Sequence, residues 1–158
     1  MNEDLVIDAL TEAKTLGMFK KICDKNASAE ARIRLRNIYD HSSNAITTTK
    51  NLILNELELD VSTDQARRLT QLILAFLKKS TYRKPISKQI KQNLLYKQKN
   101  RCAICNCGID LTAHADHIVP FKYVGDELED NLQMLCADCN LKKNASIDFQ
   151  IRFFLGLV

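Results

Sequence analysis

The sequence predicts an α+β protein that is mostly helical, with a helical bundle in residues 1–80 and a small mixed domain in residues 81–158. Three observations support this division. Residues 1–80 contain no proline and a single glycine, and their apolar residues recur at helical spacing. The second part instead contains two C-x-x-C pairs and two short strand-like segments. A chain of 158 residues is long enough for one large domain or two small ones.

The first two helices are predicted from apolar periodicity. Residues 3–24 repeat apolar side chains at helical spacing and are expected to form the first helix. Ser28 can cap a second helix, because a serine hydroxyl accepts hydrogen bonds from the first free backbone N–H groups. Ile33, Leu35 and Ile38 are expected on the buried side of that helix.

The next two helices complete the predicted bundle. Residues 51–59 are rich in leucine and are expected to form a short helix. Ser62 and Gln65 have the spacing of a capping box, so Thr63–Lys79 is expected to be a helix. No chemical motif occurs in this part. It is therefore expected to bind a partner protein, to form a homodimer or to add DNA contacts, and the sequence leaves these alternatives open.

The second part is expected to begin with a linker and a basic amphipathic helix. Pro85 suits the entry to a helix, because its missing N–H is not needed there. The expected elements are a linker at 80–85, helices at 86–99, 137–143 and 147–157, strands within 109–118 and at 132–135, and a loop at 119–131.

Positive charge is concentrated between the two parts. Residues 1–77 carry 10 Lys/Arg and 11 Asp/Glu, residues 78–101 carry 9 Lys/Arg and no acid, and residues 102–158 carry 4 Lys/Arg and 8 Asp/Glu. A basic segment of this kind is a candidate contact for a nucleic-acid backbone. Lys97, Lys99 and Arg101 are its members nearest the cysteine-rich part. The alternative is a solvated basic helix face.

The composition favours a cytoplasmic protein with reduced cysteines. No run of about 18 apolar residues occurs, so no membrane span is expected. The first ten residues are acidic and lack the basic start of a signal peptide. Because cytoplasmic thiols stay reduced, the six cysteines suggest metal ligation before disulfides.

Four of these cysteines predict a structural zinc site. Cys102, Cys105, Cys136 and Cys139 form two C-x-x-C pairs, and a two-residue spacer lets both sulfurs of a pair reach one tetrahedral ion. Four thiolates fill the zinc coordination shell and leave no open position, so the ion should be structural and not catalytic. Cys107 lies close enough to compete as a ligand and is expected to be a free, partly buried thiol.

A second group of residues suggests phosphodiester hydrolysis. Asp116 and Asn140 offer hard oxygen donors that suit an octahedral Mg²⁺ or Mn²⁺. His117 offers an imidazole, the side chain that most often serves as a general base and can deprotonate a water molecule. Neighbouring residues in a regular strand point to opposite faces, so Asp116 and His117 can serve one site only if the backbone departs from a strand.

The motifs in this region resemble those of the HNH endonuclease family. The segments are DHIVP at 116–120, NLQMLC at 131–136 and CNLKK at 139–143. Together with the paired knuckles they match the family in order, over roughly residues 101–145. The resemblance implies a ββα-metal fold with zinc knuckles and a metal-dependent endonuclease that acts on DNA.

The resemblance also implies roles for individual residues. His117 would be the general base, and Asp116 and Asn140 would ligate the divalent catalytic metal. Asn131 would brace the loop between the strands and so hold His117 in place. Lys143 would lie beside the DNA backbone or the scissile phosphate. The expected products are a 5′-phosphate and a 3′-hydroxyl.

Two further contacts with nucleic acid are expected near these motifs. Lys142 is expected to add positive charge beside Lys143. His114 lies two residues before Asp116, on the same face of an extended segment, and would touch a phosphate or tune the metal. A simple surface histidine is the alternative. Acidic residues between the strands, among them Asp126, are expected to form a solvated rim.

Two positions depart from the family pattern. Asn140 stands where the family often has histidine, and Val124-Gly125 stands where two glycines are common. By analogy with small family members, the expected biological setting is restriction or anti-phage defence. Two other functions stay open, a non-catalytic zinc-containing nucleic-acid-binding module and a protein-interaction module. A preference for DNA over RNA is not fixed by these residues.

Overall fold

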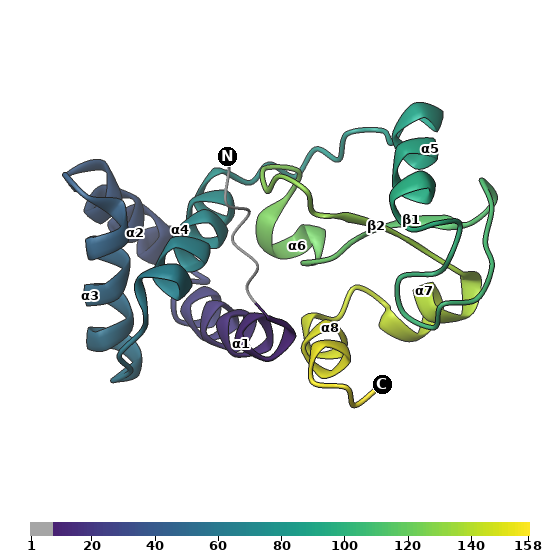
Figure 1. Cartoon of the computed structure of the whole chain (residues 1–158). Helices are drawn as coiled ribbons and strands as arrows, with labels where there is room; N and C mark the ends of the chain where they lie inside the picture. Colours follow the sequence, from purple (N-terminus) through teal and green to yellow (C-terminus); the bar gives the residue numbers. More distant parts are fainter. Residues whose placement is uncertain (1–7) are drawn as a thin grey trace, which may run out of the picture.

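The computed structural model describes residues 8–158, and it places the helices of the first part beside a second part that contains a two-stranded antiparallel sheet (Figure 1). The predicted fold class, mostly helical α+β, is confirmed. The helices and strands in chain order are α1 (Ala9–Lys25), α2 (Ala29–Asp40), α3 (Ala45–Leu57), α4 (Thr63–Lys78), α5 (Lys88–Lys97), β1 (His114–His117), α6 (Phe121–Val124), β2 (Leu132–Leu135), α7 (Ala137–Lys143) and α8 (Ile147–Phe154).

Side-chain caps set the starts of the first helices. The Asp8 carboxylate accepts a hydrogen bond from the Thr11 N–H and begins α1. The part of the expected first helix before residue 8 lies outside the described residues. Ser28 caps α2 as predicted. The predicted capping box of Ser62 and Gln65 is present at α4.

Two expectations for the bundle are wrong. Helix α3 begins at Ala45 and not near residue 51, because the Asn44 side chain accepts hydrogen bonds from two N–H groups of its first turn. In α2, Ile33 and Ile38 are half exposed, at 53% and 50%. The buried stripe of α2 contains Leu35 and its neighbours at i±4, and the two isoleucines lie off that stripe.

The main hydrophobic core extends across the predicted boundary at residue 80. It joins residues of α1, α3 and α4 to Val119, Val124 and Ile147 from the second part. Phe19 of α1 packs edge-to-face against both Phe76 of α4 and Tyr123 of α6. Helix α1 lies against α8, and α4 lies against α6. The second part is therefore anchored on the bundle through α6 and α8.

The second part places a small sheet between helices. Strands β1 and β2 pair in antiparallel register, with His117 opposite Leu132 and His114 opposite Leu135. Helix α5 packs against β2 by burying Leu95 against Met134. Helix α7 packs against both strands. The arrangement of two strands followed by α7 is the predicted ββα unit.

The predicted boundaries of this part need four adjustments. The first strand is limited to residues 114–117, and the expected loop contains the short helix α6. Helix α5 begins at Lys88, because the Ser87 hydroxyl accepts from the Ile90 N–H. Helix α8 ends at Phe154, before Gly156 with its positive φ of 72°.

Within residues 8–158, no helix has both the length and the apolar character that a membrane crossing requires.

Candidate metal and nuclease site

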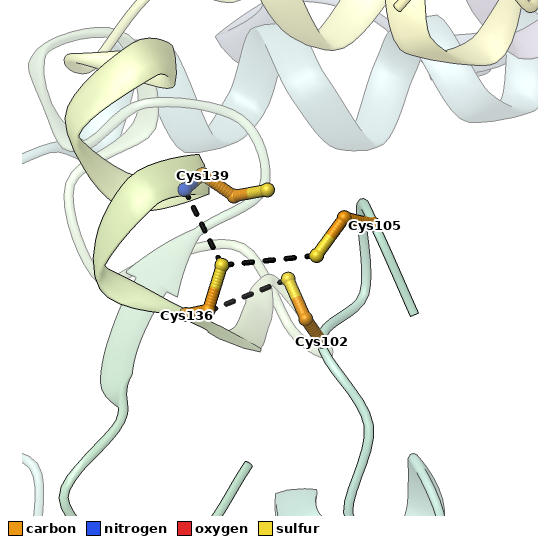
Figure 2. A group of neighbouring side chains, drawn as sticks. All are labelled: Cys102, Cys105, Cys136 and Cys139. Atoms are coloured by element: carbon orange, nitrogen blue, oxygen red, sulfur yellow. Dashed lines mark hydrogen bonds between the residues drawn. The ribbon is translucent and has the colours of Figure 1, made fainter. Parts of the chain in front are cut away.

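Four cysteine sulfurs converge from the two knuckles (Figure 2). The Sγ atoms of Cys102, Cys105, Cys136 and Cys139 all lie within 4.8 Å of one another. The Sγ atoms of Cys105 and Cys136 are 3.7 Å apart. Zinc–sulfur bonds of about 2.3 Å in a tetrahedron place neighbouring sulfurs about 3.8 Å apart. The donor set and its spacing therefore fit a structural zinc ion.

The polypeptide around the cluster stabilises its sulfurs. The Cys136 N–H donates to Cys102 Sγ, and the Cys139 N–H donates to Cys136 Sγ, each at 3.4 Å. Hydrogen bonds from the backbone and side chain of Cys107 lower the pKa of Cys105 to about 6. Burial instead raises the pKa of Cys139. Because zinc binds thiolates, occupancy of the site would deprotonate all four sulfurs.

Cys107 lies outside this four-sulfur set. Cys107 is exposed, and this corrects the expectation of a partly buried thiol. The hydrogen bond to Cys105 raises the pKa of Cys107 to about 12. The Cys107 carbonyl accepts from the Cys102 N–H at 2.8 Å and closes the knuckle. Cys107 therefore shapes the knuckle through its backbone.

The Asp116 carboxylate is held by side chains of α7 and β2. Its Oδ2 lies 2.8 Å from the Lys143 ammonium of α7 and accepts from Gln133 Nε2 of β2 at 3.0 Å. Gln133 Nε2 also donates to Gln150 Oε1 of α8 at 3.2 Å. Both contacts to Asp116 use Oδ2. Among the described residues, Oδ1 is therefore the oxygen with which Asp116 would hold a cation.

Asn140 belongs to α7, the helix that also carries Lys143. It precedes Lys143 by three residues, and side chains three apart share a helix face. Lys143 reaches across that face to Asp116 and to the His117 carbonyl, which accepts from Nζ at 2.7 Å. A carboxylate oxygen and an amide oxygen are donors that Mg²⁺ and Mn²⁺ accept. The residues therefore fit such an ion in donor type, with Lys143 as a neighbouring positive charge.

The His117 side chain has different partners from Asp116. The imidazole is 7% exposed, and its Nε2 lies 2.8 Å from Asp126 Oδ1. The ring packs edge-to-face on Phe121, with centroids 5.4 Å apart. His117 and Asp126 line a cavity of about 640 Å³ beside α5, together with Lys97. The side chains of Asp116 and His117 thus have different partners, while Lys143 contacts the carboxylate of one and the carbonyl of the other.

Asn131 fastens the end of β1 to the start of β2. Its Oδ1 accepts from the Val119 N–H, and its Nδ2 donates to the Val119 carbonyl, each at 2.8 Å. The Asn131 carbonyl accepts from the Ile118 N–H at 2.9 Å. Asn131 is 6% exposed, so these bonds are protected from water. The segment that follows His117 is therefore fixed by one side chain.

Comparison with known protein families identifies the family that this region matches. Residues 102–146 match the family model described as HNH endonuclease. The C-terminal part of the chain contains an HNH domain. The match includes both C-x-x-C pairs and the residues from Asp116 to Asn140 described above. No curated protein and no solved structure gives a significant match to the chain.

Most of the predicted nucleic-acid contacts of the HNH domain are exposed. His114 and Lys142 are exposed on β1 and α7, and Lys97, Lys99 and Arg101 are exposed at the end of α5 and beyond it. Arg101 also donates to the Asn106 carbonyl at 3.0 Å and so braces the first knuckle.

Lys143 does not have the surroundings expected of a DNA contact. It is 1% exposed, and its ammonium is bound to Asp116 and to the His117 carbonyl. An ammonium held in this way inside the HNH domain is not available to an external phosphate. Its neighbour Lys142 is the exposed cation of this turn.

Sequence reasoning missed two contacts of the HNH domain. Asp126, expected on a solvated rim, is bonded to His117. Gln133, on β2, links Asp116 to α8. The only sequence signal for Asp126 was its place directly after Gly125. For Gln133, the signal was a polar residue inside an apolar strand, which is uncommon unless the side chain has a partner.

Proposed function

We propose that the chain is a metal-dependent endonuclease that hydrolyses phosphodiester bonds of DNA. The observation that carries this proposal is the HNH match over residues 102–146, which includes Asp116, His117, Asn131 and Asn140 together. The four-sulfur cluster supports it, because it would hold the two knuckles that flank these residues.

In this proposal His117 removes a proton from the attacking water. Histidine is the side chain that most often takes this role in enzymes. The ring is held on one side by Asp126 and on another by Phe121, and it borders the cavity beside α5. Asn131 fixes the segment after His117, so that the ring keeps its direction during the reaction.

Asp116 and Asn140 would hold the divalent ion. Such an ion supplies charge neutralisation for the phosphate and its leaving oxygen. Lys143 holds Asp116 by Oδ2 and the main chain of His117 by its carbonyl oxygen. Lys143 therefore couples the positions of the proposed base and the proposed ligand, and its role is internal.

The basic segment before the HNH domain is the proposed DNA contact. Lys97, Lys99 and Arg101 are exposed where the chain enters the first knuckle. Lys97 also borders the cavity that His117 lines. Contacts of this kind bind the phosphate backbone without reading sequence. The affinity for DNA is accordingly expected to fall steeply as the salt concentration rises.

Replacing His117 by alanine should abolish most cleavage. Loss of a general base typically lowers the rate by about 10²–10⁴-fold. The measurement is nicking of supercoiled plasmid by the zinc-loaded protein with and without Mg²⁺ or Mn²⁺, with the ends of the product analysed. His41→Ala is the control, because His41 is an exposed residue at the end of α2. Full metal-dependent cutting by His117→Ala would contradict the proposed mechanism.

One observation favours a non-catalytic zinc module as the second candidate. The Lys143 ammonium already pairs with Asp116 at 2.8 Å, and this charge opposes a cation at the same carboxylate. If wild-type protein binds DNA without metal-dependent nicking of DNA or RNA, this second function replaces the first. If Mg²⁺-dependent nicking of DNA is found and is lost in His117→Ala, the second function is excluded.

A further inference from the structure

The segment that joins the bundle to the HNH domain contacts Asp126, a hydrogen-bond partner of His117. Asp126 uses both of its carboxylate oxygens in this contact. Oδ1 lies 2.8 Å from His117 Nε2, and Oδ2 accepts from the Lys84 N–H at 2.7 Å. Lys84 belongs to the linker between α4 and α5, 42 residues before Asp126. The carboxylate therefore ties the imidazole to the main chain of the linker.

Gly125 allows this contact to form. Its φ of 58° and ψ of −141° belong to a backbone region that is essentially reserved for glycine. A Cβ at this position would also lie 3.1 Å from Lys79 Cβ, closer than ordinary van der Waals contact. The turn thus ends α6, brings its backbone against the start of the linker and directs Asp126 toward both Lys84 and His117.

A second partner of the imidazole, Phe121, also contacts the linker. Phe121 packs edge-to-face on His117, and the Arg83 guanidinium lies 4.5 Å from the centroid of the Phe121 ring. Lys79, at the start of the linker, donates from Nζ to the Lys122 carbonyl. Two neighbouring linker residues, Arg83 and Lys84, therefore reach His117 through two different partners.

We propose that Asp126, held by the Lys84 N–H, is the positioning residue of His117, and that it keeps the proton on Nε2 so that Nδ1 is the basic nitrogen. This inference rests on the proposed nuclease function for its catalytic meaning. Its structural part concerns the ring and the carboxylate alone, and it can be tested without a substrate.

The chemistry of the carboxylate dictates the direction of the hydrogen bond. Partial burial raises the pKa of Asp126, but the hydrogen bonds from His117 and from the Lys84 N–H outweigh it, and the pKa lies below its ordinary value. An ionised carboxylate only accepts hydrogen bonds. Nε2 must therefore donate, and in the neutral ring Nδ1 is left with the lone pair that takes a proton.

Asparagine at position 126 cannot reproduce both contacts while the proton stays on Nε2. Its side chain has one accepting oxygen and one donating nitrogen. If the oxygen faces His117, the NH₂ group faces the Lys84 N–H. If it is turned around, the NH₂ group faces Nε2 and favours the other tautomer. The first orientation loses the bond from Lys84, and the second keeps both contacts only by moving the imidazole proton to Nδ1, so Asp126→Asn is a nearly isosteric test.

The first test determines which ring nitrogen of His117 carries the proton. It uses NMR of ¹⁵N-histidine-labelled protein at a pH above the titration range of imidazole. His117 is assigned by comparison with His117→Ala among the three histidines. Wild-type protein should show the proton on Nε2, with an N–H signal that survives solvent exchange because it is hydrogen-bonded. In Asp126→Ala that signal should be lost to exchange. A wild-type proton on Nδ1, or equally fast exchange in both proteins, would overturn the inference.

The second test uses cleavage kinetics in two backgrounds. In the otherwise wild-type protein, Asp126→Asn should lower kcat by about 10–100-fold, the usual effect of losing a partner that orients a histidine, with KM little changed. Asp126→Glu should recover part of the rate. In the His117→Ala background, Asp126→Asn should not lower kcat any further. Equal losses in both backgrounds would show a merely structural role and would overturn the inference.

The controls separate this inference from the proposed function. Glu129→Gln makes the same change of charge on the same loop at an exposed position, and it should leave the rate and the NMR signal unchanged. Zinc content and the thermal midpoint are measured for each variant. Absence of cleavage by wild-type protein would reject the nuclease proposal, whereas the NMR result would still decide the position of the proton.

Discussion

Cys105→Ser should abolish zinc binding and unfold the region around the two knuckles. Structural zinc contributes apparent binding free energies of about 10–16 kcal/mol in small zinc modules, and that energy is folding energy. The core at the knuckles is small and consists mainly of Leu135 packed on Cys102 and Cys139. Without the ion, this core has too little apolar surface to hold the two loops. Zinc content by mass spectrometry and amide NMR signals from residues 101–145 measure the effect.

Cys107→Ser is the matched control for this prediction. Cys105 and Cys107 are both exposed and lie two residues apart, but only Cys105 belongs to the four-sulfur set. The Cys107 variant should retain one zinc per chain and its amide signals. In the Cys105 variant the helical bundle should keep its helicity, because its core contains no member of the cluster. A folded knuckle region without zinc would contradict the structural role of the ion.

Lys143→Ala should destabilise the protein by about 3 kcal/mol. Removing one partner of a buried ion pair leaves an uncompensated charge and costs about 3–5 kcal/mol. The lower end applies here, because the Asp116 side chain is 15% exposed while that of Lys143 is fully buried. The His117 carbonyl would also lose its hydrogen bond from Nζ. The free energy of unfolding is measured by urea denaturation of the zinc-loaded protein.

Lys142→Ala provides the comparison for Lys143. It removes the same type of side chain from the next position of α7, where the residue is exposed. Surface substitutions of this kind change stability by about 0.5 kcal/mol or less. The Lys142 variant should instead weaken DNA binding, as expected for a cation that faces solvent. Equal stabilities of the two variants would show that the internal contacts of Lys143 do not contribute.

The helices and the zinc cluster could be predicted because their signals are local. A capping box needs only Ser62 and Gln65, and α7 and β2 were predicted with the boundaries that the structure has. The buried face of α2 was predicted wrongly, because it depends on how the neighbouring helices pack against α2. Ile33 and Ile38 are five residues apart, and α2 buries a narrow stripe of Ala31, Leu35 and Tyr39 that excludes both. A periodic pattern predicts a helix better than it predicts which face is covered.

The partners of the candidate catalytic residues could not be predicted. Asp126 is nine residues from His117, and Lys84 is 42 residues from Asp126. Nothing local to either position indicates that one carboxylate joins them. Lys143 has the sequence environment of a surface lysine, with Lys142 beside it, and its burial depends on how α7 lies against β1.

The sequence by itself determined the residue types that do chemistry, because four thiols at C-x-x-C spacing and an Asp-His pair restrict the possible ligands and bases. Only the tertiary structure decided which groups hold them. Long-range packing brings α7 against β1 and the linker against Asp126, and it places Asp126 on His117 and Lys143 on Asp116. Such contacts depend on the relative positions of whole elements, which local sequence patterns do not encode.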